Sequence, residues 1–154
     1  MTPIKILPQK EKKKITEMLK QQFGIKEIQG IILQRGAERL FLFQGDFTES
    51  QIGKLERFIP IERVGIYLGK IQNNEIRLSI DAVQLLKNQI TKNIFELNKE
   101  QAEKWMQGNE LNIETNKRGF IVIKYKDYFL GTGKASENKI TNFIPKNRRL
   151  KEKG

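Results

Sequence analysis

The chain has 154 residues, with 29 Lys and Arg against 18 Asp and Glu, a net charge of +11, and neither cysteine nor histidine. The two missing residue types exclude disulfides, zinc fingers, zinc ribbons and any catalytic arrangement built on a Cys or His side chain. No segment approaches the roughly 18 uninterrupted apolar residues of a membrane span, and no signal-peptide core begins the sequence. We therefore expect a cytoplasmic protein with no cofactor, no metal and no membrane partner.

The first predicted elements are a helix and a hairpin. Apolar residues at helical spacing from Ile15 to Phe23 predict a helix over 9–23, which Gly24 ends. Two runs rich in apolar residues, 28–34 and 39–44, are separated by a short segment that contains glycine. This spacing predicts a pair of strands joined by a turn.

A second helix is marked by its start. Thr48 and Gln51 have the spacing of a capping box, and Phe47 and Ile52 that of a hydrophobic staple. We expect the apolar stripe to continue through Ile59 and the helix to end at Pro60.

A second hairpin and a third helix complete the first half. Strands are predicted over 64–71 and 75–80, with a turn at Asn73 and Asn74. Alternation in the second strand predicts that Arg77 faces outward. A helix is predicted over 81–91, and its expected buried residues are Ala82, Leu85, Leu86 and Ile90. No linker rich in Gly, Ser or Pro follows, so we expect the two halves to pack directly against each other.

The last part of the chain is predicted to be mostly strands. A short strand over 94–97 precedes a helix capped by Asn98 and Gln101, in which Trp105 is expected to be core. Three further strands are predicted over 119–125, 128–135 and 139–144. Short strands joined by tight turns indicate a small closed or half-closed barrel. The predicted class is α+β, with domains at 1–92 and 93–154 and a basic C-terminal tail.

The positive charge is unevenly distributed. Residues 1–24 carry a net +4, residues 25–114 a net −1 and residues 115–154 a net +8. Such asymmetry points to a polyanionic partner, nucleic acid ahead of an acidic membrane surface. The alternative interpretation is a tail that serves solubility.

Candidate binding residues gather near the C-terminus. The cations expected to contact phosphates are Lys134, Lys139, Lys146, Arg148, Arg149 and Lys151. Asn142 and Asn147 lie among them as candidates for contacts to bases, and Lys70 and Arg77 extend the surface. Cations supply phosphate contacts, whereas amides and aromatic rings can read or stack bases. The combination favours RNA over a membrane surface.

Signals of catalysis are weak. The sequence contains neither a P-loop nor a dinucleotide-binding glycine motif before a helix. Paired carboxylates such as Glu100 and Glu103 have lysines beside them, which is typical of a solvated surface. We therefore do not expect an enzyme, although chemistry based on carboxylates and lysines stays open as a minor alternative.

Several segments resemble a known family. Residues 105–111, 119–125, 129–134 and 139–149 are similar to a PUA-type RNA-binding domain, and most similar to the C-terminal PUA-like domain of the RsmF class of ribosomal RNA cytosine-5 methyltransferases. Phe129 replaces a proline that is usual in the family, and Thr141 replaces a lysine, which removes one phosphate contact. The first half resembles, in the order of its motifs, the pre-PUA domain of small archaeal and eukaryotic ribosome-assembly factors.

The resemblance implies a function in which RNA is bound without being modified by this chain. Methyltransferases of that class attack cytosine with a cysteine, which this sequence lacks. We therefore expect a monomeric, archaeal-type, non-catalytic protein of ribosome biogenesis or RNA modification that binds rRNA, or else tRNA. The alternative is a subunit that targets a separately encoded RNA methyltransferase to its substrate. A ribosome-assembly factor or an RNA-modifying enzyme is the expected protein partner.

Overall fold

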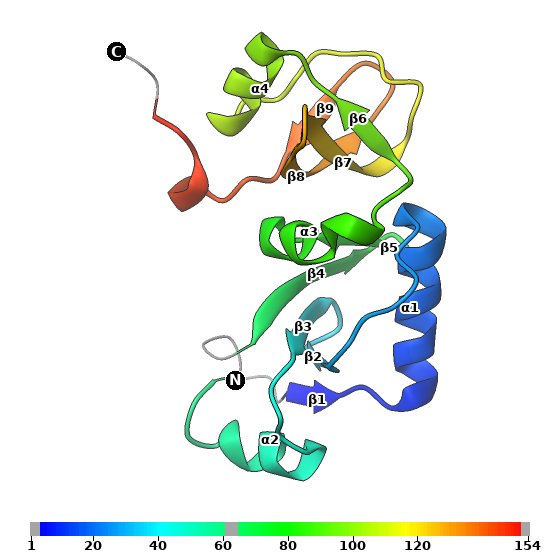
Figure 1. Cartoon of the computed structure of the whole chain (residues 1–154), viewed down its shortest axis with the longest axis vertical. Helices are drawn as coiled ribbons and strands as arrows, with labels where there is room; N and C mark the ends of the chain where they lie inside the picture. The colour runs from blue at the N-terminus through cyan, green and yellow to red at the C-terminus, as the bar shows by residue number, and fades with distance from the viewer. Residues whose placement is uncertain (1–3, 61–64, 152–154) are drawn as a thin grey trace.

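The structure, a computed structural model, describes residues 4–60 and 65–151 and contains two β-sheets stacked along the long axis of the molecule (Figure 1). The first sheet is antiparallel, in the order β1-β2-β3-β4-β5. Its strands are β1 Ile4–Ile6, β2 Ile31–Arg35, β3 Arg39–Phe43, β4 Ile66–Gln72 and β5 Glu75–Leu78.

The second sheet has the order β6-β7-β8-β9, with β6 parallel to β7 and the other pairs antiparallel. Its strands are β6 Ile94–Glu96, β7 Gly119–Tyr125, β8 Tyr128–Ala135 and β9 Ile140–Asn142. A single bridge joins Leu111 to Ile140 beside β9. Among the described strands the order does not return to β6, so this sheet is open at both edges, and the closure of the predicted barrel stays a prediction.

The helices cover the sheets and lie between them. The α-helices are α1 Gln9–Phe23, α2 Glu49–Leu55, α3 Ile80–Leu86 and α4 Lys99–Met106, and short 3₁₀ turns follow at Lys87–Gln89 and Lys146–Arg148. Helix α3 lies between the sheets and packs on both β4 and β8 (Figure 1). The predicted α+β class, with a C-terminal β unit that carries one short helix, is confirmed.

Local signals placed several of these elements correctly. Helix α1 has the predicted bounds, and Gly24 ends it in the left-handed conformation with φ 79°. Both predicted capping boxes form: Gln51 N donates to Thr48 Oγ1 at 3.2 Å, and Gln101 N donates to Asn98 Oδ1 at 2.9 Å. Each box satisfies main-chain groups that the first helical turn leaves without a partner.

Other expectations were wrong in detail. The predicted helix over 81–91 is a shorter α-helix followed by a 3₁₀ turn, and Val83 is buried where Leu85, 41% exposed, was expected. Helix α2 ends at Leu55, so Ile59 lies beyond it and is exposed. Strand β1 was not predicted. The start of the predicted strand at Val64 lies outside the described residues.

The two halves share one hydrophobic core. Phe120 and Val122 on β7 belong to the same buried cluster as Leu19 and Phe23 on α1. The neighbouring β7 residues Ile121 and Ile123 point the other way, into a second cluster that contains Trp105. The prediction that the halves pack directly is confirmed, and the proposed division between residues 92 and 93 stays a prediction.

Candidate functional site

The predicted site residues are spread over three parts of the structure. Lys146, Asn147, Arg148, Arg149 and Lys151 follow β9, in and just after the last 3₁₀ turn. Lys134, Lys139 and Asn142 lie on β8, in the next turn and on β9. Lys70 and Arg77 lie on the paired strands β4 and β5, directly opposite each other.

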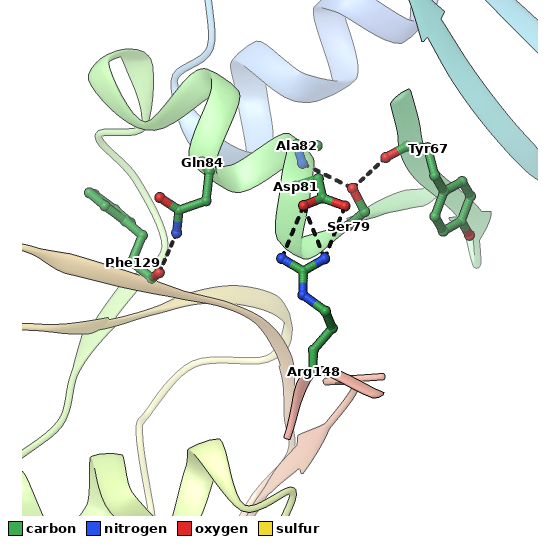
Figure 2. Close-up of polar contacts among 7 residues, drawn as sticks. All are labelled: Tyr67, Ser79, Asp81, Ala82, Gln84, Phe129 and Arg148. Atoms are coloured by element: carbon green, nitrogen blue, oxygen red, sulfur yellow. Dashed lines mark hydrogen bonds and ion pairs between the residues drawn. The ribbon is translucent and has the colours of Figure 1, made fainter. Parts of the chain in front are cut away.

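The cations of the tail differ in their partners. Arg148 forms a bidentate ion pair with Asp81 at the start of α3, with N–O distances of 3.2–3.3 Å (Figure 2). Lys146 and Lys151 are exposed, and no ion pair joins either of them to an acidic residue in the described part of the chain. These two lysines therefore have the freest charges of the segment.

Arg149 has a structural position. Its Nε donates to the carbonyl of Ile144 at 2.9 Å, and the main-chain N–H of Leu150 donates to the carbonyl of Met106 at 2.8 Å. Gly108 leaves room for the arginine, because a Cβ at that position would lie 2.5 Å from Arg149 Cδ. The tail is thus held against the end of α4, and Arg149 contributes to holding it.

Asn142, expected to contact bases, is committed to the fold. Its Nδ2 donates to the carbonyls of Trp105 and Asn109 at 2.8 and 3.0 Å, and its Oδ1 accepts from the N–H of Ile144 at 2.8 Å. Both amide hydrogens are therefore used. The side chain fixes β9 to the end of α4, and we replace the base-contact expectation with this positioning role.

The remaining candidates are partly engaged. Lys139 pairs with Glu110 at 3.4 Å and Lys70 with Glu38 at 3.3 Å. Lys134 lies over the ring of Phe120, 5.7 Å from its centroid. Ion pairs between exposed or half-exposed groups, such as those of Lys139 and Lys70, contribute little stability. Lysines held in this way remain able to exchange their carboxylate for a phosphate.

Arg77 does not face open solvent as predicted. It alternates correctly with the buried Ile76 and Leu78, but Phe143 of the second half lies against it. Its guanidinium lies 4.4 Å from the centroid of Phe143, which also packs on Phe120 at 6.1 Å. The half-buried arginine is therefore part of the junction between the two sheets.

A hollow of about 290 Å³ lies at this junction. The first half contributes Tyr67, Arg77 and residues 78–81 to its wall, and the second half contributes Gly131, Thr132, residues 143–145, Asn147 and Arg148. Sequence reasoning predicted the charges but not the hollow. A sequence signal for this wall is Gly131-Thr132-Gly133 on β8, where a polar residue stands between two glycines.

No group of three or more metal-ligating side chains occurs within residues 4–60 and 65–151. Over the same ranges, none of the helices has the length and apolar character that crossing a membrane requires.

Comparison with known protein families supports the predicted resemblance. Residues 92–150 match the family described as the Methyltransferase RsmF PUA domain. The resemblance of the C-terminal part to this PUA domain is therefore confirmed.

Curated relatives are similar to more than this domain. The chain is 31% identical over 139 residues to ribosomal RNA small subunit methyltransferase F of Shewanella oneidensis, covering 89% of this chain and 28% of that protein. It is 27% identical over 149 residues to the protein of the same name from Psychromonas ingrahamii, covering 92% and 30%. The chain thus spans under a third of the length of these relatives. They are bacterial, so the expected archaeal character has no support.

Proposed function

We propose that this chain is a non-catalytic RNA-binding protein of ribosome biogenesis or RNA modification, and that it binds rRNA, with tRNA as the alternative partner. The observation that carries the proposal is the basic segment after β9, which has no acidic residue between Glu137 and Glu152 and exposes Lys146 and Lys151. Concentrated positive charge on a rigid unit is how proteins attract the phosphate backbone. The similarity to the RsmF PUA domain and to proteins named ribosomal RNA small subunit methyltransferase F supports the proposal.

The non-catalytic part of the proposal rests on what the sequence lacks. Methyltransferases of the resembling class use a cysteine nucleophile, and the chain has no cysteine. We expect no methyl transfer when the chain alone is incubated with rRNA and S-adenosylmethionine. We propose that the chain acts in the cytoplasm and is a monomer.

The direct test is binding to RNA measured by fluorescence anisotropy at several salt concentrations. Transcribed small-subunit rRNA fragments, tRNA and duplex DNA of equal length form the three arms. Three neutralised phosphates would give a slope of about −2 to −3 in a plot of log affinity against log salt. A flat salt response, or equal affinity for all three nucleic acids, would contradict a specific RNA function.

The free lysines of the tail give the first prediction. We expect the double variant Lys146→Ala, Lys151→Ala to bind every RNA more weakly and to make the salt slope shallower by about 2, because each lysine contacts one phosphate. The melting temperature should not change, since both side chains are exposed. The matched control is Lys10→Ala, Lys13→Ala, which removes the same charge from the exposed side of α1. Equal losses in both variants would argue for attraction by net charge alone.

Asp81 gives a prediction of the opposite sign. Replacing Asp81 with asparagine removes the carboxylate that holds Arg148 and takes a negative charge from the rim of the hollow. We expect RNA to bind more tightly by about threefold to tenfold, while stability falls by less than about 1 kcal/mol, because the pair is exposed. Asp127→Asn, in the exposed turn before β8, is the control with the same change of charge. Weaker binding by Asp81→Asn would show that Arg148 is not a phosphate contact.

A targeting subunit that acts with a separately encoded methyltransferase is the second candidate. The first half exposes large apolar side chains around and after α2, namely Phe47, Phe58 and Ile59, with Phe58 83% exposed. Exposed apolar groups that lie together are typical of protein-binding surfaces. If this candidate is correct, a tagged chain should recover a methyltransferase from cells, and Phe58→Ser should abolish the recovery without affecting RNA binding.

A further inference from the structure

The hollow between the two sheets has the features of a ligand site. Its volume of about 290 Å³ is close to the lower end of the range for small-molecule pockets. Both halves of the chain build it, so it exists only because they pack together. Asp81 is the one acidic residue among those that line it, against Arg77 and Arg148. The lining is therefore net positive.

One wall combines an aromatic ring with a guanidinium. Arg77 lies over Phe143 at 4.4 Å, and both residues line the hollow. A guanidinium stacked on a ring is a flat, rigid and cationic surface. Unpaired bases of RNA stack on arginine planes and on aromatic rings in the same way. The wall thus fits a planar aromatic ring better than an acidic peptide, whose carboxylates pair with cations but offer no ring that stacks.

A second wall contains an unsatisfied hydroxyl. Thr132 lies opposite Val122 in the β7–β8 register, and Val122 packs in the shared core, so the Thr132 side chain points toward the first half of the chain. Thr132 is 4% exposed and lines the hollow, and its Oγ1 has no hydrogen-bond partner among residues 4–60 and 65–151. Buried hydroxyls are nearly always satisfied because an unpaired one is unfavourable. A polar group of a ligand would satisfy it.

The rim of the hollow can exchange a carboxylate for a phosphate. Figure 2 shows the Arg148 guanidinium reaching Asp81 from the C-terminal segment, with both side chains about half exposed, at 43% and 54%. An exposed pair of this kind is weak, and arginine binds phosphate with the same bidentate geometry as carboxylate.

We propose that this hollow binds one unpaired nucleotide of the RNA partner. The base lies against Arg77 and Phe143, a polar edge of the base bonds to the Thr132 hydroxyl, and the adjoining phosphate takes the place of Asp81 on Arg148. The inference rests on the proposed RNA-binding function and adds to it a recognition step beyond attraction by charge. It also gives the junction of the two halves a role that neither half could have alone.

The experiment follows the main-chain amides of the isotope-labelled full chain by NMR. The probes are a short single-stranded RNA of mixed sequence, ribonucleoside monophosphates, inorganic phosphate and a poly-glutamate peptide. We expect the RNA and at least one nucleotide to shift Gly131, Thr132 and Asn147, whereas phosphate alone shifts residues near Arg148 and leaves Gly131 and Thr132 in place. The peptide should leave Gly131 and Thr132 in place.

The matched variants are Thr132→Val and Thr141→Val. Thr141 lies on the neighbouring strand and does not line the hollow. Thr132→Val should weaken RNA binding by about threefold to tenfold, the value of one hydrogen bond, without lowering the melting temperature, because the hydroxyl has no partner to lose. Thr141→Val should leave affinity unchanged.

The outcomes separate the inference from the function on which it rests. RNA binding with no shift at Gly131 and Thr132, and with equal affinities for the two variants, would overturn the nucleotide site and leave the RNA-binding function in place. No RNA binding at any salt concentration would overturn both. Larger shifts at Gly131 and Thr132 with the peptide than with RNA would reassign the hollow to an acidic protein partner. The wild-type shifts decide the question even if a variant fails to fold.

Discussion

Replacing Trp105 with alanine is expected to lower the free energy of unfolding by about 3–5 kcal/mol, the usual effect of deleting a large buried aromatic side chain. Trp105 on α4 is fully buried, and its indole Nε1 donates to the carbonyl of Leu130 on β8 at 2.8 Å. Its own carbonyl accepts from Asn142 on β9 at 2.8 Å. The alanine variant keeps this main-chain bond but loses the indole bond to β8 and the packing of the ring in the cluster that contains Ile140 of β9, so α4, β8 and β9 all loosen.

The same variant should lose RNA binding, because the basic tail follows β9 and is held to the end of α4. For a chain of this size a melting temperature falls by about 2–4 °C for each kcal/mol, so circular dichroism should record a drop of about 6–20 °C. Trp105→Phe keeps most of the buried ring and loses the indole hydrogen bond. It should lose less stability than the alanine variant and keep RNA affinity at low temperature. A loss of stability below about 1 kcal/mol in Trp105→Ala would contradict the assigned packing.

Elements with strong local signals could be predicted from the sequence. The bounds of α1, β7 and β8 agree with the predictions because apolar periodicity, caps and turn residues all lie within each segment. The turn at Asn73 and Asn74 has positive φ at both residues, 54° and 62°. Asparagine tolerates this conformation well, which is why the turn was recognised.

Elements that depend on distant partners could not be predicted. Strand β1 has three residues and exists because β2 pairs with it. Helix α3 buries Val83 rather than Leu85, because both β4 and β8 pack on it and change which residues face inward. A stripe read from one helix does not show how many neighbours that helix has.

The candidate site shows the same limit. The cations near the C-terminus could be identified from composition, yet their roles depend on residues far away in the chain. Arg148 is paired with Asp81, and Arg77 is covered by Phe143. The hollow is built from both halves of the chain, so no single segment of the sequence carries its signal.

Phe120 links the two halves, so replacing it shows whether they unfold together as one cooperative unit. Phe120 on β7 is 2% exposed and packs in the cluster that contains Leu19 and Phe23 of α1. Its ring also supports Phe143 at 6.1 Å and Lys134 at 5.7 Å. Phe120→Ala should lower the free energy of unfolding by about 3–5 kcal/mol and weaken RNA binding, because Phe143, which lines the hollow, and the candidate phosphate contact Lys134 both lose their support.

Two signals can follow the halves separately. Fluorescence of Trp105, the single tryptophan of the chain, reports on the second half, and amide exchange in α1 reports on the first. Because Phe120 belongs to the core that the halves share, both signals should lose protection together in Phe120→Ala. Ile123→Val is a milder control in the second cluster, with an expected loss of about 0.5–1.5 kcal/mol. If α1 kept its protection in Phe120→Ala while the fluorescence midpoint fell, the halves would be separate units, and the hollow between them could not be a preformed binding site.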